Sequence, residues 1–422
     1  MTLATPIFAA FVGIDWADDH HDIALQAADG APIEARRLSH TPDALAHWLA
    51  TLATRFGGQP IAVALETSRA PLVYALREAS FIVLYPVNPR SLRRFREAFA
   101  PNGAKDDAPD ARLLLELLVK HRAQLRPWQP DDATTRALTY LVEQRRTVVD
   151  LRTQLTQQLI AALKDYFPQA LEWAGDDLAG PMACRFLQQW PTLDAIERAR
   201  PTTLRRFYTE HRCRSAARIE RRLTAIRTAH PLTRDAALIA SRAVYVKLLT
   251  HQLDALRPGL AALDATIAEH FATHPDAPLF AALPGAGAAL APRLLVAFGT
   301  DRTRFPSAAA MQTHAGIAPI TIRSGRQCRV QWRHATSTFL RQTLHEFAHH
   351  SVLHCAWARA CYAQLRARGK SHHAAVRALA FKWIRILWRC WHDRVPYDGA
   401  RYERALALRH SPLSQHLSPA PA

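Results

Sequence analysis

The sequence predicts an α/β domain at the N-terminus followed by a mostly α-helical remainder. Over the first 125 or so residues, short apolar runs typical of strands alternate with amphipathic stretches typical of helices. After residue 130, hydrophobic residues recur at spacings of three and four, which is the period of an α-helix. Because 422 residues exceed the size of one ordinary core, and 49% of them are hydrophobic, we expect two or three folded domains.

The N-terminal domain is expected over residues 1–125 and contains a mixed sheet. The predicted strands are Ala10 to Trp16, His21 to Ala27, Pro32 to Arg37, Ile61 to Leu65 and Phe81 to Pro86. The predicted helices are Thr41 to Ala53, Pro71 to Glu78, Ser91 to Phe99 and Pro109 to Lys120. The second and third strands are suited to antiparallel pairing with the first, and the later strand–helix alternation favours parallel neighbours.

A helical, coiled-coil-like region is expected over residues 126–275. One apolar stripe runs from Leu138 to Leu163, and a second stripe from Tyr245 to Ile267 is broken at Pro258-Gly259. The two stripes could pair as a long hairpin or join two subunits, while ordinary amphipathic core helices would show the same spacing.

A third domain, mainly helical, is expected over residues 276–400. Its strongest helix runs from Ser371 to His392, where apolar side chains share one face. Residues 401–422 are expected to be a disordered tail, because the sequence from His410 onward is rich in Ser and Pro.

The charge balance points to a polyanionic partner. The chain has 54 Lys and Arg against 36 Asp and Glu, a formal net charge of +18. Phosphate neutralisation makes double-stranded DNA the first candidate. An anionic membrane is the second, but no apolar run approaches the roughly 20 residues needed to span a bilayer. The six cysteines are scattered without a CxxC pair, which favours reduced thiols in a cytoplasmic protein.

Four carboxylates form the first candidate site. Asp15 lies near the end of the first predicted strand and Glu66 follows the fourth, while Asp107 and Asp110 lie three residues apart at the start of a helix and so share a face. Carboxylates at the ends of neighbouring strands and on a covering helix can converge, and their oxygen atoms suit Mg²⁺. In nucleases two such ions flank the reacting phosphate. Any one of these acids alone is more often a turn or capping residue.

Two segments of the third domain are candidates for phosphate chemistry. Pro284 to Gly287, a Pro-Gly-x-Gly turn, is typical of a helix–hairpin–helix that binds a phosphate, and equally of a plain interhelical turn. Farther along, Ser324 precedes Gly325 in a basic loop, where a serine can be an accessible nucleophile. Without other context, a serine at such a position is usually only a turn residue.

A basic stretch surrounds this serine. Residues 323–394 contain 14 Lys and Arg but two acids, with aromatic residues interleaved. The pattern predicts a nucleic-acid surface, although several of the tryptophans must belong to a core instead. The residues expected to contact nucleic acid are Arg323, Arg326, Arg329, Arg333, Lys382, Arg385 and Arg389.

His345, Glu346 and His349 match the H-E-x-x-H pattern, in which two histidines bind zinc and the glutamate is a general base. A third ligand is missing at the expected distance, because the residue ten after His345 is Cys355 and no further Glu follows until Glu403. We therefore interpret this match as coincidental.

Taken in order, these segments resemble the DEDD transposases of bacterial insertion sequences, specifically the one-ten family. The likeness covers roughly residues 10–400, with two departures: Pro109 stands in place of an aliphatic residue, and Gln327-Cys328 follow the Ser-Gly pair. The matching segments are Val12 to Asp15 with Ala17 and His21, Glu66, Asn88-Pro89, Lys105 with Asp107, Ala108, Asp110 and Ala111, Pro284 to Gly287, Ala315 to Ile317 with Pro319, Ser324 and Gly325, Phe339 to Arg341, Arg368 to His372, and Pro396 to Asp398.

The resemblance implies a ribonuclease-H-like N-terminal domain, similar to the RuvC junction resolvases, and a composite active site. Asp15, Glu66, Asp107 and Asp110 would bind Mg²⁺, and Ser324 would attack the scissile phosphate and hold a covalent DNA intermediate. The family also implies a structured guide RNA. A homodimer or higher oligomer is expected if the middle helices assemble subunits.

Three other functions remain open on the sequence. A RuvC-like metal nuclease would cleave DNA without a serine intermediate. A noncatalytic nucleic-acid-binding remnant of an element would keep the charge without the chemistry. A zinc hydrolase would need His345 and His349 as ligands.

Overall fold

The computed structural model describes residues 7–66, 71–99, 108–213, 215–325, 327–333, 336–411 and 413. The chain divides into two compact units, residues 1–130 and residues 131–422. Within the described residues, no helix is long and apolar enough to cross a membrane.

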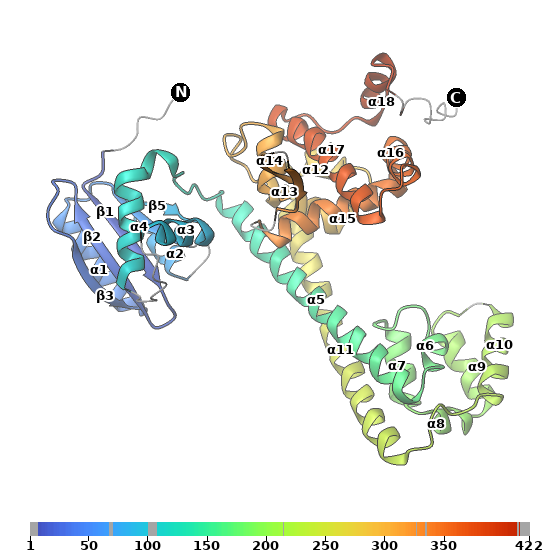
Figure 1. Ribbon diagram of the computed structural model, residues 1–422. Coiled ribbons are helices and arrows are strands. Elements are labelled where there is room, and N and C mark those ends of the chain that lie inside the picture. Colours follow the sequence, from blue (N-terminus) through green and yellow to red (C-terminus); the bar gives the residue numbers. More distant parts are fainter. Residues whose placement is uncertain are drawn as a thin grey trace. The chain divides into compact units, whose positions relative to one another are not determined.

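The first unit is built on a five-stranded sheet with the strand order β3-β2-β1-β4-β5 (Figure 1). Its strands are β1 (Ala10–Trp16), β2 (His20–Ala27), β3 (Glu34–Ser39), β4 (Ile61–Leu65) and β5 (Ile82–Pro86). β1 is antiparallel to β2 and parallel to β4, and β4 is parallel to β5. This mixed, ribonuclease-H-like sheet confirms the predicted fold class, and all five strands lie close to their predicted positions.

Different helices cover the two faces of this sheet, because side chains alternate between faces along each strand. Val12 and Ile14 pack on one face with α1 and α2, whereas Ala62 and Ala64 pack on the other with α3 and α4. The elements are α1 (Pro42–Arg55), α2 (Pro71–Leu76), α3 (Pro89–Phe99), α4 (Ala108–His121) and the 3₁₀ turn η1 (Arg122–Gln124). The first unit is therefore a three-layer α/β structure.

The second unit contains two long helices, α5 (Ala133–Tyr166) and α11 (Ala236–Ala272), which lie side by side (Figure 1). They run antiparallel, because Arg145 pairs with Asp264 near one end and Arg242 pairs with Asp165 at 2.7 Å near the other. The long-hairpin interpretation of the two apolar stripes is confirmed.

The predicted break at Pro258 is wrong, since α11 continues through this residue. A proline inside a helix removes one backbone hydrogen bond. Leu253 and Leu260, on either side of it, are both buried. Their packing keeps the helix continuous despite the lost bond.

A small helical module lies at one end of this pair, between α5 and α11 in the sequence. Its helices are α6 (Ala170–Trp173), α7 (Pro181–Gln189), α8 (Leu193–Glu197), α9 (Pro201–Glu210) and α10 (Ala216–Arg227). Phe186, Trp190, Phe207 and Tyr208 form an aromatic core that packs onto the second half of α5 and the first half of α11. We call α6–α10 the inserted module.

The other end of the pair supports the C-terminal domain. Its elements are α12 (Ala277–Ala281), α13 (Gly287–Phe298), α14 (Ala308–His314), β6 (Ile320–Ser324), β7 (Gln327–Gln331), α15 (Thr338–His354), α16 (Ala356–Ala367), α17 (His372–Asp393) and α18 (Gly399–Leu408). Leu138 and Val142 of α5 join its core, together with Ile267 of α11. The predicted strong helix is confirmed as α17.

The tail expected from residue 401 is wrong in its first part, because α18 extends to Leu408. Asp398 caps this helix by accepting a hydrogen bond from the backbone N–H of Arg401 at 3.0 Å. Tyr402 contributes an aromatic contact with the buried Trp357. Apart from Leu413, residues beyond Ser411 lie outside the described part of the chain.

Candidate active site

Asp15 and Glu66 are brought together by the register of two parallel strands. Ile14 is paired with Leu65 in the β1–β4 ladder, so Asp15 and Glu66 are the next residues on adjacent strands. Ile14 and Leu65 point into the core beneath α1 and α2. Because side chains alternate along a strand, Asp15 and Glu66 point to the opposite face, which α4 covers. Both side chains are half-buried.

Asp110 reaches the same face through the close approach of α4 to β1. It lies in the first turn of α4. A Cβ atom at Gly13 would overlap the backbone carbonyl oxygen of Ala111 and the backbone nitrogen of Leu115. Only glycine at position 13 lets α4 lie this close to the strand. The Gly that precedes Ile14-Asp15 therefore sets the position of a third carboxylate.

The three carboxylates line one open cavity of about 440 Å³. Asp22, on β2, also lines this cavity but forms an ion pair with Arg37 at 3.3 Å. The remaining lining residues are Trp16, Ala17, His20, Pro89, Arg93 and Arg96. The cavity thus combines hard oxygen ligands on the sheet with cationic side chains on α3.

Arg96 forms an ion pair with Asp110 across the gap between α3 and α4. Its Nε atom is buried and has no hydrogen-bond partner among the described residues. Arg93 pairs with Glu97 at 2.9 Å on the exposed side of α3. Sequence analysis missed both arginines, although their three-residue spacing on a predicted helix places them on one face.

The electrostatics of the cavity favour a bound cation. Burial raises the pKa of Glu66, the nearby Asp110 carboxylate raises this pKa further, and Arg96 lowers it in part. Like charges that destabilise one another in this way are relieved by a divalent ion. The donor set consists of carboxylate oxygens, which fits a hard cation.

Within the described ranges, no three Asp, Glu, His or Cys side chains converge tightly enough to coordinate one ion. Asp15, Glu66 and Asp110 surround a cavity rather than closing on one point, and Asp110 is held by Arg96. The fourth predicted ligand, Asp107, lies outside the described residues.

His21 stabilises the turn that follows Asp15. Its Nδ1 atom accepts a hydrogen bond from the backbone N–H of Ala17 at 3.3 Å, and its Nε2 atom lies 2.9 Å from Nδ1 of His40. Burial lowers the pKa of His21 to about 4, with His40 and His20 adding to the effect and Asp22 opposing it. The imidazole is therefore neutral at pH 7 and can accept this hydrogen bond.

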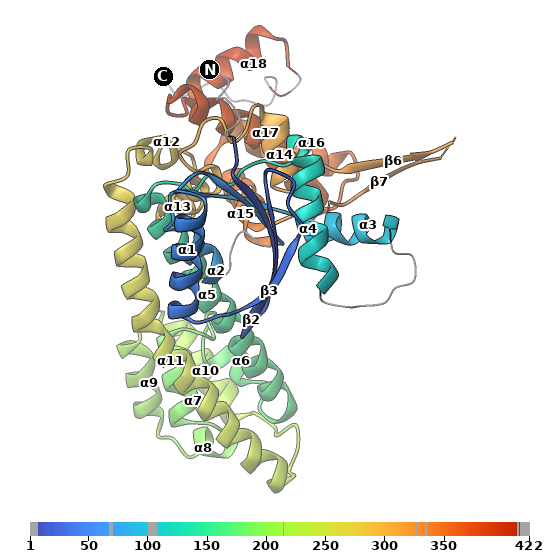
Figure 2. The same cartoon turned by 90° about the vertical axis from the view of Figure 1, so that its left-hand side faces the viewer.

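Ser324 lies at the tip of an exposed hairpin formed by β6 and β7 (Figure 2). It is paired with Gln327 across the two-residue turn that begins with Gly325, whose φ is +57°. Ser324 is exposed, so its hydroxyl is accessible. The departure noted at Gln327-Cys328 is simply the first part of β7.

The base of this hairpin is fixed to the C-terminal domain. Gly316 has φ of +69°, and a Cβ atom there would overlap the side chain of Thr336. Ala315 and Ile317 are buried in the domain core. Beyond the second strand, the guanidinium of Arg377 lies over the ring of Trp332. The hairpin therefore projects from an anchored base.

Arg323 and Arg329 are exposed on the hairpin beside Ser324, and Arg333 is half-buried just after it. Arg326, the next residue after Gly325 in the sequence, lies outside the described residues. On α17, Arg385 is exposed, Lys382 is half-buried, and Arg389 forms an ion pair with Asp393.

The aromatic residues of this stretch are mostly core residues. Trp357, Trp383 and Trp391 are fully buried, and the indole N–H of Trp391 donates to the carbonyl oxygen of Gly299 at 2.7 Å. The large exposed aromatic among them is Trp332, at 44%. The expectation that several tryptophans belong to a core is confirmed.

The Pro-Gly-x-Gly turn packs tightly against a neighbouring helix. Gly285 has φ of +80°, and a Cβ atom there would lie 2.9 Å from His354 and 3.1 Å from the carbonyl of His350, at the end of α15. This contact explains why glycine is needed at position 285. It favours the plain interhelical turn over the phosphate-binding alternative.

The H-E-x-x-H segment forms part of α15, but its glutamate is occupied. The carboxylate of Glu346 accepts hydrogen bonds from Arg293 at 2.5 Å and from Arg146 at 3.0 Å. Arg293 is almost fully buried and depends on this partner for its charge. Glu346 therefore stabilises the junction of α5, α13 and α15 and is not available as a general base beside His345 and His349.

Two family models match the chain. Residues 12–168 match the DEDD transposases of the IS110 type, described as a transposase. Residues 277–363 match the transposase family IS116/IS110/IS902. The first match contains the acidic cavity, and the second contains the hairpin with Ser324. DEDD transposases are enzymes that use a divalent metal ion.

Relatives from bacterial insertion elements match over nearly the whole length. The mini-circle putative transposase for IS117 of Streptomyces coelicolor is 31% identical, over 93% of this chain and 96% of that protein. The IS900 uncharacterized 42 kDa protein of Mycobacterium paratuberculosis is 26% identical, over 94% of this chain and 98% of that one. The IS110 uncharacterized 43.6 kDa protein of Streptomyces coelicolor is 27% identical over 92% of this chain.

Proposed function

Because the chain belongs to the IS110 family of transposases, which are DNA phosphoryl-transfer enzymes, we propose that it cuts and rejoins DNA strands through two cooperating sites. One is the acidic cavity of Asp15, Glu66 and Asp110, with Asp107 as a fourth ligand. The other is the hydroxyl of Ser324. The observation that carries this proposal is that three carboxylates, distant in sequence, line the same cavity.

The acidic residues are proposed to bind Mg²⁺. A bound divalent ion polarises the phosphate and stabilises charge on the leaving oxygen. Asp15 and Glu66 are held by the sheet, whereas Asp110 is paired with Arg96, which would exchange this carboxylate for a phosphate oxygen. Support comes from the raised pKa of Glu66, which is due first to burial and then to the nearby Asp110 carboxylate, because a bound cation would offset both costs of keeping Glu66 ionised.

Ser324 is proposed as the nucleophile. Its Oγ atom forms a bond to the scissile phosphorus as the bond between phosphorus and the leaving strand oxygen breaks, and overall the hydroxyl proton passes to that oxygen. Attack by the hydroxyl of a second strand reverses these changes and releases Ser324. Arg323 and Arg329 flank the serine and would stabilise the phosphate charge. The phosphoester conserves the bond energy, so rejoining needs no external energy source.

The proposed partners are double-stranded DNA and a structured guide RNA of the same element. The two proposed sites must act on the same phosphate, within one subunit or across a homodimer. The family membership supports these partners, and the net charge of +18 is suited to both nucleic acids.

The proposal is tested by a strand-cleavage assay on DNA that contains the element ends, with Mg²⁺ or with a chelator. Glu66→Gln, Asp15→Asn and Asp110→Asn should each lower cleavage at least a hundredfold while folding is retained. Asp22→Asn is the matched control, because Asp22 lines the same cavity but is not one of the four proposed ligands. It should keep most of the activity. Normal cleavage by the first three variants would show that the metal site is wrong.

A further inference from the structure

The inserted module concentrates positive charge in a way that the proposed chemistry does not use. Residues 198–234 contain eleven arginines, no lysine and two glutamates, a net charge of +9 against +18 for the whole chain. Half of the net charge therefore lies in 37 residues, far along the sequence from both proposed sites.

Part of this charge has a structural role. Arg222 is buried, donates to the carbonyl oxygen of Glu172 at 3.2 Å and lies over the ring of Tyr208. Arg205 is paired with Glu220 at 2.7 Å, which joins α9 to α10. Two further ion pairs, Arg198 with Asp194 and Arg206 with Glu210, join residues that are four apart in the sequence. These four arginines do not need an external partner.

Six other arginines are exposed and form no ion pair within the described residues. They are Arg200, Arg212, Arg218, Arg221, Arg227 and Arg234. Placing six like charges on one small module costs self-repulsion. Because they form no ion pair among the described residues, their charge is available to a partner.

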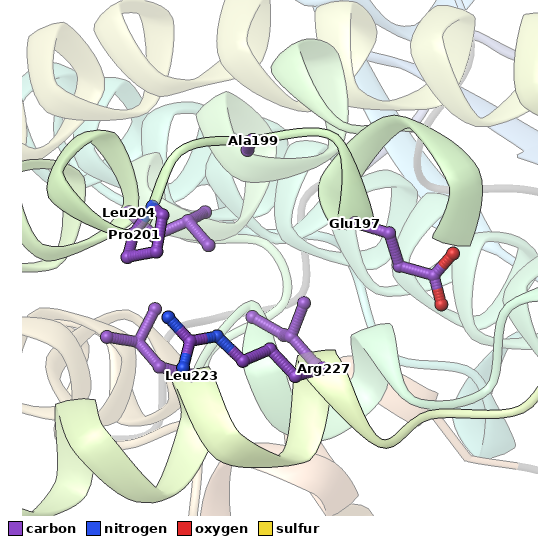
Figure 3. Close-up of a pocket in the computed structure, with 7 residues that line it drawn as sticks. Glu197, Ala199, Pro201, Leu204, Leu223 and Arg227 are labelled. Carbon is purple, nitrogen blue, oxygen red and sulfur yellow. The ribbon is translucent and has the colours of Figure 1, made fainter.

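Arg227 shows how such a side chain is presented. It lines an open cavity of about 410 Å³ between α10 and the segment that joins α8 to α9. The guanidinium extends over Leu223 toward Pro201 and Leu204, while the Glu197 carboxylate lies on the other side (Figure 3). The guanidinium lies above apolar side chains and forms no ion pair within the described residues, so it is available to an anionic group from outside.

The module is also far from the serine hairpin. α5 has 34 residues, and its first part packs in the C-terminal domain core while its last part packs in the module core. Leu138 in one core and Leu159 in the other lie 21 residues apart on α5, so at a rise of about 1.5 Å per residue the helix separates them by on the order of 30 Å. A ligand held at the module therefore contacts the protein at a second location.

We propose that the arginine-rich surface of α8–α10 is a separate nucleic-acid-binding surface that holds the phosphate backbone of DNA or RNA. The guanidinium of arginine can make bidentate contacts to phosphate oxygens, so exposed arginines without an acidic partner suit a phosphate backbone. A lipid surface is disfavoured, because Leu232 is the large apolar residue exposed in the described part of this segment, and interfacial helices need a row of them.

The surface is tested with the full-length protein carrying Arg200→Gln, Arg218→Gln, Arg221→Gln and Arg227→Gln. The control variant removes four exposed cations of α5, α7 and α11 that also form no ion pair within the described residues: Arg152→Gln, Lys164→Gln, Arg185→Gln and Lys247→Gln. Binding to a 30-base-pair DNA duplex and to an RNA hairpin is measured from 50 to 200 mM salt. Both probes carry the same fluorophore.

The module variant should bind at least one probe ten times or more weakly at 100 mM salt. For duplex DNA, the salt dependence of binding is the slope of log affinity against log salt, and each phosphate contact contributes about 0.9 to its magnitude. Losing four contacts should therefore reduce this magnitude by up to about 3.6. The control should change less than threefold. Loss confined to the hairpin assigns the surface to RNA, loss confined to the duplex assigns it to DNA, and loss for both assigns it to the shared backbone.

Equal binding by the module variant and the wild type, or an equal loss in both variants, would overturn the proposal. Circular dichroism and thermal melting check that the variants fold, and Arg218→Gln with Arg221→Gln is the milder pair if four changes are too many. Ser324→Ala should bind both probes normally. A failure of the binding proposal for the arginine surface can therefore be distinguished from a failure of the proposed serine chemistry.

Discussion

The acidic cavity and the serine hairpin are built in opposite ways. Asp15 and Glu66 stand at adjacent ends of paired strands, and the backbone of α4 lies directly against Gly13. Ser324 is at the tip of a two-stranded ribbon, where a Cβ atom at Gly325 would contact nothing within 4 Å. One site is positioned by close packing, whereas the other presents a single hydroxyl on an exposed extension.

This difference shows that the position of the carboxylates depends on the packing of their own domain, whereas the position of the serine does not. The carboxylates need the sheet, because strand register alone sets which residues are neighbours. The serine needs accessibility, and the residues that would activate it are not found on its own strands. A nucleophile on a projecting hairpin can be carried to a phosphate that another part of the assembly holds.

The largest effect is expected when the two sites are separated onto different polypeptides. Asp15→Asn and Ser324→Ala proteins should each be inactive alone. If the active site is composed of the cavity of one subunit and the serine of another, mixing the two proteins should restore a measurable fraction of recombination. A mixture as inactive as its components would instead place both groups in the same subunit. Recombination is read out as joined DNA product.

Nucleic-acid binding by the wild-type protein should fall on the order of a thousandfold between 50 and 200 mM salt, if six or more phosphates are neutralised. Substituting Arg323 and Arg329 should reduce the magnitude of the slope of log affinity against log salt by about 1.8, because each phosphate contact contributes about 0.9. A fluorescence titration of labelled duplex measures both. An unchanged slope would mean that the hairpin does not contact the backbone.

Glycine substitutions should separate the packed site from the exposed one. Gly13→Ala forces a methyl group into the backbone of α4 and should cost about 1–3 kcal/mol of unfolding free energy, with a loss of cleavage. Gly325→Ala meets no neighbour and should cost only about 1 kcal/mol, through its positive φ. Urea denaturation compares the two. A larger loss of unfolding free energy for Gly325→Ala than for Gly13→Ala would contradict the view that the acidic cavity is the tightly packed site.

A smaller effect concerns the pH dependence of the first unit. The pKa of His21 is about 4 in the folded protein against 6.5 as its ordinary value, so the unfolded chain binds a proton first as pH falls. Stability should be complete above about pH 6.5 and decrease toward pH 4, by at most about 3 kcal/mol. His21→Gln should flatten this part of the melting-temperature profile. A profile as steep as that of the wild type would assign the effect to other groups.

The strands and the acidic set could be predicted because their signals are local. Runs such as Ile61–Leu65 mark buried strands, and the acids at their ends follow directly in the sequence. The arginines of α3 were missed, since pairing of Arg96 with Asp110 depends on how two helices pack and not on either sequence alone.

Other features depended on tertiary context. Pro258 predicts a helix break, but the packing of α11 along α5 outweighs the missing hydrogen bond. The basic aromatic stretch suggested stacking on bases, whereas Trp357, Trp383 and Trp391 form a core. Composition alone cannot say which side of a helix faces inward.

The most direct test of the central claim is to look for DNA covalently attached to Ser324. Reactions with Mg²⁺ and nicked or otherwise stalled DNA substrates are quenched in detergent, separated from free protein, and digested for mass spectrometry. The account predicts a nucleotide adduct on the peptide that contains Ser324. The adduct and recombination should both be absent in Ser324→Ala and present in Thr321→Ala, which removes another exposed hydroxyl of β6. Recombination by Ser324→Ala at the wild-type rate would contradict the account and leave a metal nuclease without a serine intermediate.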